Sequence, residues 1–139
     1  MSCRGLSSGK TVGKRILLVD DNEINLEIAR ELLIAQGFLV ESAENGSKAL
    51  EMVEHSEPGY YDLILMDVQM PEMGGHEAAK AIRQLENKEL ARIPIIALSA
   101  NAFPEDYQKS MDAGMDAHSP KPFDIQELQE LIQDILNKR

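Results

Sequence analysis

The chain has 139 residues, the usual size of one domain, so its length predicts one hydrophobic core and leaves no room for a second folded effector module. The formal charge is −10, and because residues 1–15 carry four basic residues and no acid, residues 16–139 hold −14. This excess of acids argues against direct binding of nucleic acid by the folded part.

The N-terminal residues and the cysteine content bear on the cellular location of the protein. Cys3 is the only cysteine, which excludes an internal disulfide and a multi-cysteine zinc site and favours a reducing, cytoplasmic location. No apolar run approaches the ~18–20 residues of a membrane span, and the N-terminus lacks the hydrophobic centre of a secretory signal. Residues 1–13 are predicted to be a disordered linker or a remnant of cloning, and residues 14–139 the folded domain.

From Ile16 onward, short apolar runs alternate with longer segments of helical period. This alternation predicts βαβ units and therefore an α/β fold with a mainly parallel sheet. Five strands are expected, at about 15–19, 38–43, 62–66, 94–98 and 115–118.

Five helices are expected to connect and follow these strands. The first is marked by one apolar stripe, formed by Ile24, Ile28, Leu32 and Ala35. Asn22 is its predicted cap, and Gly37 is its predicted stop. The other helices are marked by shorter stripes within 49–53, 78–85, 107–111 and 125–135. All five stripes are predicted to face the core.

Three carboxylates stand where apolar runs end: Asp20 and Asp21 follow residues 16–19, and Asp67 follows the third run. Ligands bind beyond the carboxyl ends of strands in open α/β sheets, so these acids are predicted to converge in one pocket with Ser99 and Lys121. Adjacent acids repel unless a cation bridges them, which makes Mg²⁺ with its oxygen ligands the candidate ion. Because a carboxylate can act as a nucleophile toward phosphorus, the pocket is predicted to handle phosphoryl groups.

Each of these residues taken alone has an ordinary structural explanation. Asp at a strand end is common as a cap or turn residue, Ser99 alone would be a loop serine, and Lys121 alone a surface charge. The prediction therefore depends on all five positions together. Residues 20–25 read DDNEIN, and neither GxGxxG nor GxxxxGK[ST] occurs, so the sequence implies no nucleotide site.

Four blocks of the sequence resemble the receiver domain of two-component response regulators. They are ILLVDDNEIN (16–25), DLILMDVQMPEMGG (62–75), PIIALSAN (94–101) and GMDAHSPKPF (114–123), in the family's order and spacing. The resemblance covers roughly residues 14–138. It implies a doubly wound, flavodoxin-like (βα)5 fold, with a five-stranded parallel sheet in the strand order 2-1-3-4-5.

The resemblance also implies which residues bind Mg²⁺ and phosphate. Asp67 would be the phospho-acceptor, and Asp21 and Asp67 would be direct ligands of Mg²⁺. Asp20 would act mostly through metal-bound water, and the backbone carbonyl of Gln69 would complete the protein ligands.

By the same resemblance, Ser99 and Lys121 would bind the phosphoryl oxygens. Lys121-Pro122 matches a family step whose peptide bond is usually cis, which would aim the lysine into the pocket. Ser99 stands where many members have threonine, an exchange that keeps the hydroxyl. His118 stands where receivers often have an aromatic switch residue, and it is predicted to be either a rotamer switch or a pH-dependent surface residue.

The leading hypothesis is a phospho-acceptor switch in a phosphorelay, in which a histidine kinase or a histidine phosphotransfer protein donates a phosphoryl group to Asp67. The DDNEIN and ALSANAF segments resemble receivers attached to hybrid histidine kinases, and a stand-alone response regulator is the alternative. Such a domain is no enzyme beyond its own phosphorylation and dephosphorylation. We expect a monomer or weak dimer, with no membrane in this segment.

Two further hypotheses belong to other functional classes. A Mg²⁺-dependent phosphatase with an Asp nucleophile is disfavoured, because such enzymes place a second acid two residues after the nucleophile and here Gln69 follows Asp67 at that spacing. A docking module that signals without phosphate is disfavoured by the presence of all five site residues.

Overall fold

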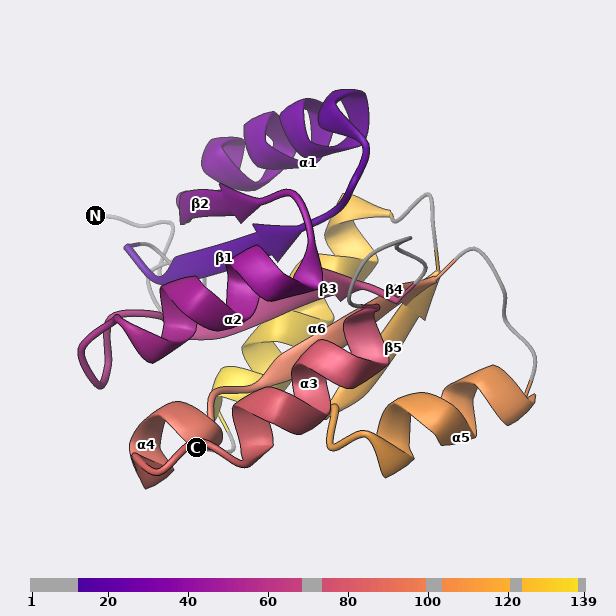
Figure 1. The fold of residues 1–139 in the computed structure, drawn as a ribbon. Coiled ribbons are helices and arrows are strands. Elements are labelled where there is room, and N and C mark those ends of the chain that lie inside the picture. Colours follow the sequence, from indigo (N-terminus) through magenta and orange to yellow (C-terminus); the bar gives the residue numbers. More distant parts are fainter. Residues whose placement is uncertain (1–12, 69–73, 100–103, 121–123, 138–139) are drawn as a thin grey trace.

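The computed structural model describes residues 13–68, 74–99, 104–120 and 124–137. Five parallel strands form one sheet in the order β2-β1-β3-β4-β5 (Figure 1). The strands are β1 (Arg15–Val19), β2 (Leu39–Ala43), β3 (Leu63–Asp67), β4 (Ile95–Ser99) and β5 (Ala117–Pro120). The predicted doubly wound, flavodoxin-like fold and its strand order are therefore confirmed. Most of the predicted linker, residues 1–12, lies outside the described residues.

Helices cover both faces of the sheet, as the alternating pattern predicts. They are α1 (Glu23–Ala35), α2 (Gly46–Glu54), α3 (Gly75–Arg83), α4 (Lys88–Ala91), α5 (Pro104–Asp112) and α6 (Ile125–Asn137). One core cluster joins the sheet to α1 and α6, and the other joins it to α2 and α3 (Figure 1). The short α4 was not predicted, because four residues are too few to show a helical period. Among the described residues, no helix has both the length and the apolar character to cross a membrane.

The three inner strands, β1, β3 and β4, consist mostly of apolar residues because both faces of the sheet are covered, whereas the edge strands β2 (LVESA) and β5 (AHSP) include polar residues. All five residues of β3 and of β4 are buried. Along β1, Leu17 and Val19 belong to the cluster with α2 and α3, whereas Ile16 and Leu18 belong to the cluster with α1 and α6. Continuous apolar runs thus correspond to strands that lie inside the molecule.

The predicted ends of α1 are confirmed. The side chain of Asn22 accepts the backbone N–H groups of Ile24 and Asn25, which otherwise have no partner at a helix start. The helix ends at Ala35, and Gly37 follows with φ of +99°, a conformation that glycine adopts without strain.

The predicted apolar stripe of α1 is wrong as a core face. Ile24, Ile28 and Leu32 are 68%, 54% and 39% exposed, and Ala35 is exposed as well. The residues that face the sheet form a second apolar row of the same helix, Leu26, Ala29 and Leu33. Both rows have helical spacing, so periodicity alone could not decide which of them is buried.

Two other expectations near the C-terminus need correction. Tyr107 of α5 was predicted to face the core and is instead 51% exposed. Strand β5 begins at Ala117, two residues later than predicted, because the backbone N–H of Met115 still donates to the carbonyl of Ser110 in the turn that ends α5. The stripes predicted for α2, α3 and α6 do contribute buried residues.

At the amino edge of the sheet, Arg83 joins several loops to the end of α3. Its guanidinium donates to the backbone carbonyls of Ala91, Ile93 and Gly114, each at 2.7 Å. It also forms a 2.8 Å ion pair with Asp116. Burial lowers the pKa of Arg83, and the charge of Asp116 opposes that shift. This network fixes the end of the sheet that lies opposite the acidic residues.

Candidate functional site

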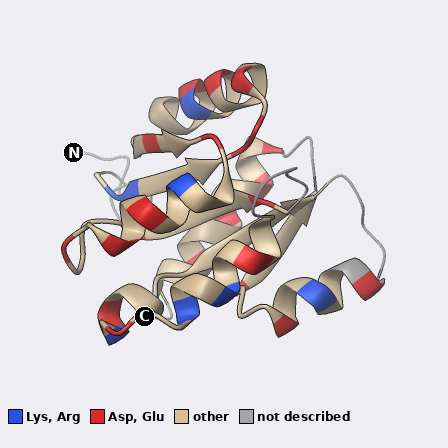
Figure 2. Ribbon diagram, in the orientation of Figure 1, with Lys and Arg blue, Asp and Glu red and all other residues tan. Residues whose placement is uncertain are grey.

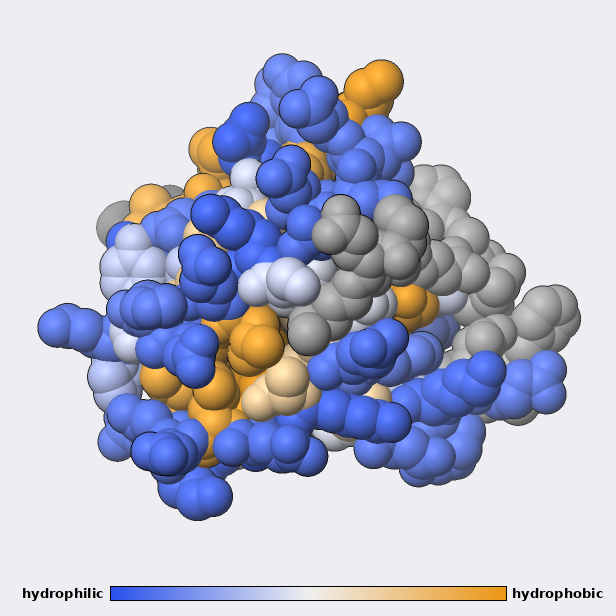
Figure 3. All heavy atoms as spheres, viewed as in Figure 1, coloured by the Kyte–Doolittle hydropathy of each residue, from blue (hydrophilic) through white to orange (hydrophobic). Residues whose placement is uncertain are grey.

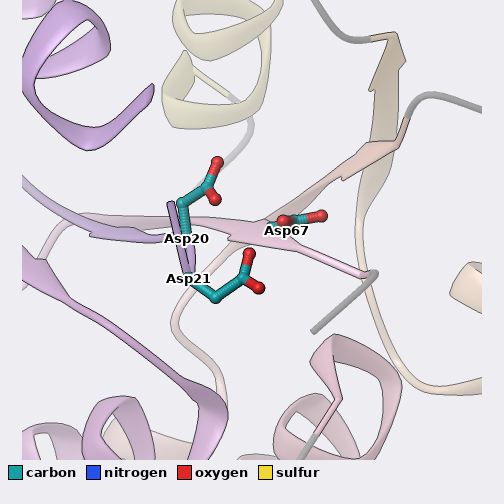
Figure 4. A group of neighbouring side chains, drawn as sticks. All are labelled: Asp20, Asp21 and Asp67. Carbon is teal, nitrogen blue, oxygen red and sulfur yellow. The ribbon is translucent and has the colours of Figure 1, made fainter. Parts of the chain in front are cut away.

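Three carboxylates meet at the carboxyl edge of the sheet, where β1 and β3 end (Figure 4). The register pairs Val19 with Met66, which brings Asp20 level with Asp67 on the neighbouring strand. Each of Asp20, Asp21 and Asp67 offers one oxygen, and these oxygens lie within 4.8 Å of one another. The predicted convergence of the three acids is therefore observed.

The three acids differ in exposure. Asp20 and Asp67 are 4% and 2% exposed, whereas Asp21 is open to solvent. Buried like charges at this separation repel strongly in a medium of low dielectric constant, and an oxygen-binding cation relieves the repulsion. The donor set consists of carboxylate oxygens, the ligands that Mg²⁺ prefers, so the residues present fit this ion.

Local backbone structure orients the carboxylate of Asp20. Its Oδ1 accepts the backbone N–H of Asn22 at 2.9 Å, and its own backbone N–H donates to the carbonyl of Ala43 at 3.2 Å. The first bond closes a turn between the end of β1 and the start of α1. Asp20 is therefore held by the same residue that caps α1.

Asp67 is held from the side of α3. A Cβ atom added to Gly75 would lie 2.5 Å from the carbonyl oxygen of Asp67 and 2.7 Å from Cα of Val68. By its sequence alone, Gly75 is an ordinary turn glycine at the end of the block DLILMDVQMPEMGG. The structure shows a different requirement: the first turn of α3 presses on the backbone of Asp67, and any side chain at residue 75 would push it away.

Ser99 lies at the same edge, on the strand next to β3. The β3–β4 register pairs Asp67 with Leu98, and Ser99 follows as the last residue of β4, only 1% exposed. The backbone N–H of Val68 donates to the carbonyl of Leu98, which keeps the ends of the two strands together. Ser99 thus belongs to the strand end beside Asp67, as the sequence predicts.

His118 is half-buried on β5, opposite Ala97 of β4. Side chains two residues apart in a strand share a face, so Ser99 and His118 lie on the same side of the sheet. The His118 ring makes an edge-on contact with the ring of Tyr107, with centroids 5.8 Å apart. Its Nε2 atom is buried and has no hydrogen-bond partner in the described part of the chain. The other predicted site residues, Gln69, Lys121 and Pro122, lie outside the described residues.

A family model of the response regulator receiver domain matches residues 16–133. The chain belongs to this family. Receiver domains are in general signalling domains rather than enzymes, and the acids at the strand ends occupy the edge where parallel α/β sheets bind ligands.

This receiver domain is homologous to those of hybrid histidine kinases. It is 42% identical over 125 residues to hybrid signal transduction histidine kinase L of Dictyostelium discoideum. The match covers 89% of this chain and 7% of the kinase, so the chain spans a small part of that relative's length.

Solved structures show the same fold. The receiver domain of a sensor histidine kinase from Pseudomonas aeruginosa, with magnesium coordinated in its active-site cleft, is 37% identical with a TM-score of 0.80; the match covers 91% of this chain and 99% of that one. A co-crystal structure from Saccharomyces cerevisiae contains a histidine phosphotransfer signalling protein and the receiver domain of its downstream response regulator. That match has 30% identity and a TM-score of 0.79, and it covers 88% of each chain.

Proposed function

We propose that this receiver domain is the phospho-acceptor of a phosphorelay and that Asp67 takes the phosphoryl group. One observation carries the proposal: the buried carboxylate of Asp67 lies within 4.8 Å of those of Asp20 and Asp21, at the edge where the sheet binds ligands. The proposed unit is the folded domain of residues 14–139, and its proposed location is the cytoplasm.

In the proposed step, an oxygen of the Asp67 carboxylate bonds to phosphorus while the P–N bond of a phosphohistidine breaks. The electron pair of that bond returns to the imidazole, which takes up a proton from solvent, and Asp67 becomes an acyl phosphate. Transfers of this kind need mainly positioning and charge neutralisation. The hydroxyl of Ser99 would donate to a phosphoryl oxygen, and Lys121 would pair with the negative charge.

The acidic cluster would hold Mg²⁺. Asp21 and Asp67 would bind the ion directly, Asp20 through water, and Gln69 through its backbone carbonyl. Bound there, Mg²⁺ would neutralise charge on the carboxylates and on the phosphoryl oxygens. The similar receiver domain from P. aeruginosa, which holds magnesium in its active-site cleft, supports this assignment.

The exposed apolar row of α1 suits the docking of the phosphohistidine partner. Ile24, Ile28 and Leu32 form a ridge that starts two residues after the cap of α1, and orange spheres appear over α1 among hydrophilic ones in Figure 3. Acidic residues dominate the charges on this helix (Figure 2). We infer that the partner presents an apolar helix face with basic residues at its rim, such as the surface of a histidine phosphotransfer protein.

We further propose that occupancy of the site is reported through Ser99 and His118. Movement of the Ser99 hydroxyl toward phosphate would vacate space on the face that it shares with His118, next to the small side chain of Ala97. Nε2 of His118 is buried and has no hydrogen-bond partner among the described residues, and such a buried polar atom is destabilising. Movement of the ring to a place where Nε2 gains a partner would therefore be favourable. A parent protein of the hybrid histidine kinase type is proposed from the relatives.

Intact-mass spectrometry after incubation with acetyl phosphate and Mg²⁺ tests the proposal, with wild type beside Asp67→Asn. We expect one added phosphoryl group on the wild type and none on the variant, whose amide has the shape of the carboxylate but is a poor nucleophile. Equal labelling of both proteins would contradict the assignment of Asp67. If the wild type takes no phosphoryl group and binds no beryllofluoride, the domain is a docking module that works without phosphate.

A further inference from the structure

Helix α5 is attached to the domain with little apolar contact. Of its described side chains, Glu105 and residues 107–112, only Ser110 is buried, at 0% exposure. A helix docked by an apolar stripe would instead bury three or four hydrophobic residues. Elements with few buried apolar contacts open most easily. The position of α5 should therefore depend strongly on its polar contacts.

One of these polar contacts comes from α3. Nε2 of His76, in the first turn of α3, lies 3.0 Å from Oγ of Ser110. The two residues are 34 positions apart in the sequence, and the bond ties the start of α3 to Ser110, the one buried side chain among those described in α5. Figure 1 shows α5 beside β5, with α3 as its helical neighbour.

The start of α3 also touches the candidate acceptor. Gly75 lies against the carbonyl oxygen of Asp67 so closely that a Cβ atom would stand 2.5 Å from it. A shift of the Asp67 backbone therefore displaces Gly75, and His76 is the next residue. A short path of packed groups leads from Asp67 through Gly75 and His76 to Ser110.

We propose that His76 is a positioning residue that couples the state of Asp67 to α5 through its hydrogen bond to Ser110. The proposal rests on the proposed function, because it requires a ligand at Asp67. This path runs through α3 and is separate from the proposed one through Ser99 and His118, whose ring contacts Tyr107 of α5. In this proposal, the state of Asp67 acts on α5 both from α3 and from β5.

Hydrogen–deuterium exchange of residues 104–112, with and without beryllofluoride and Mg²⁺, tests the coupling. In the wild type we expect beryllofluoride bound at Asp67 to change the exchange rate of the α5 amides by roughly fivefold, the factor that corresponds to one net hydrogen bond. His76→Ala and Ser110→Ala should each lose most of this response, and the double variant should lose no more than either. His76→Gln should keep it, since the glutamine amide reaches about as far as Nε2.

If the bond is merely structural, its removal in the variants will change the exchange rate of α5 equally with and without beryllofluoride. That result would overturn the proposal. An unaltered response in Ser110→Ala would also overturn it, even if His76→Ala fails to fold. His55→Ala is the matched control, because the only described hydrogen bond of the His55 side chain is to the backbone carbonyl of Glu51 at the end of α2. Phosphorylation of each variant by acetyl phosphate, followed by intact mass, separates the two proposals: a wild type that takes no phosphoryl group and binds no beryllofluoride would refute the proposed function itself.

Discussion

The backbone N–H of Asn22 donates a 2.9 Å hydrogen bond to Oδ1 of Asp20, while the side chain of Asn22 caps α1. One residue therefore orients a carboxylate of the acidic cluster and starts the helix that carries the exposed apolar row. The distance between cluster and row is set by this local turn together with the packing of Ala29 and Leu33 on the sheet. A partner helix that docks along α1, as proposed, would thereby be guided to the acids.

Removal of one acid should stabilise the domain in the absence of Mg²⁺. Asp21→Asn relieves repulsion with Asp20 and Asp67 and should raise the free energy of unfolding by about 0.5–1 kcal/mol without the ion. With Mg²⁺ the advantage should disappear, because the variant loses a ligand and its affinity falls on the order of tenfold, which is ~1.4 kcal/mol. Urea titrations with Mg²⁺ and with EDTA measure both effects.

Glu23→Gln serves as the control for this comparison, since Glu23 is also an exposed acid in the same segment but lies outside the cluster. Its unfolding free energy should respond to Mg²⁺ as the wild type does. An equal effect of both substitutions would mean that general charge, not the cluster, binds the ion.

The strands and the acids could be predicted because each depends on a local pattern. Apolar runs ended within one or two residues of the observed strands, and the acids of the cluster stand at those ends. The buried side of α1 could not be predicted, since two rows of the helix are apolar and only contact with the sheet selects Ala29 and Leu33. The close approach of Gly75 to Asp67 and the contact of His76 with Ser110 leave no local signal, because each joins separate elements.

The apolar row of α1 should matter for transfer from a protein donor and not from a small one. Ile28→Ser should slow phosphotransfer from a phosphorylated histidine phosphotransfer protein by about tenfold, the effect of losing ~1.4 kcal/mol of apolar contact. Labelling by acetyl phosphate should stay unchanged, because this donor needs no docking surface.

Ile34→Ser is the matched control, because Ile34 is 52% exposed and Ile28 is 54% exposed on the same helix. Six residues of helix place Ile34 about 120° around the axis from Ile28, away from the row. Equal loss of transfer in both variants would contradict a docking surface limited to the row. Stopped-flow or gel-based transfer assays with the same donor measure the rates.

Arg83 should be among the most sensitive positions for stability. Arg83→Ala removes donors from the carbonyls of Ala91, Ile93 and Gly114, and it should cost roughly 3 kcal/mol in unfolding free energy. The exposed Arg92→Ala should change it by less than about 0.5 kcal/mol. Urea denaturation measures both, and a small loss for Arg83→Ala would mean that water replaces the guanidinium at these carbonyls.

Tyr61 should make stability fall at alkaline pH. Burial raises the pKa of its phenol above the usual value near 10, and a 2.8 Å hydrogen bond to the Glu41 carboxylate raises it further. The phenol ionises in the unfolded chain before it does so in the folded protein, so its contribution is complete below pH 10 and is lost as pH rises toward the folded pKa. At pH 8, Tyr61→Phe should be less stable than wild type by about 1 kcal/mol, because the variant lacks the hydrogen bond to Glu41. The gap should narrow steadily above pH 10, as measured by urea denaturation at several pH values; a constant gap would show that Tyr61 ionises alike in both states.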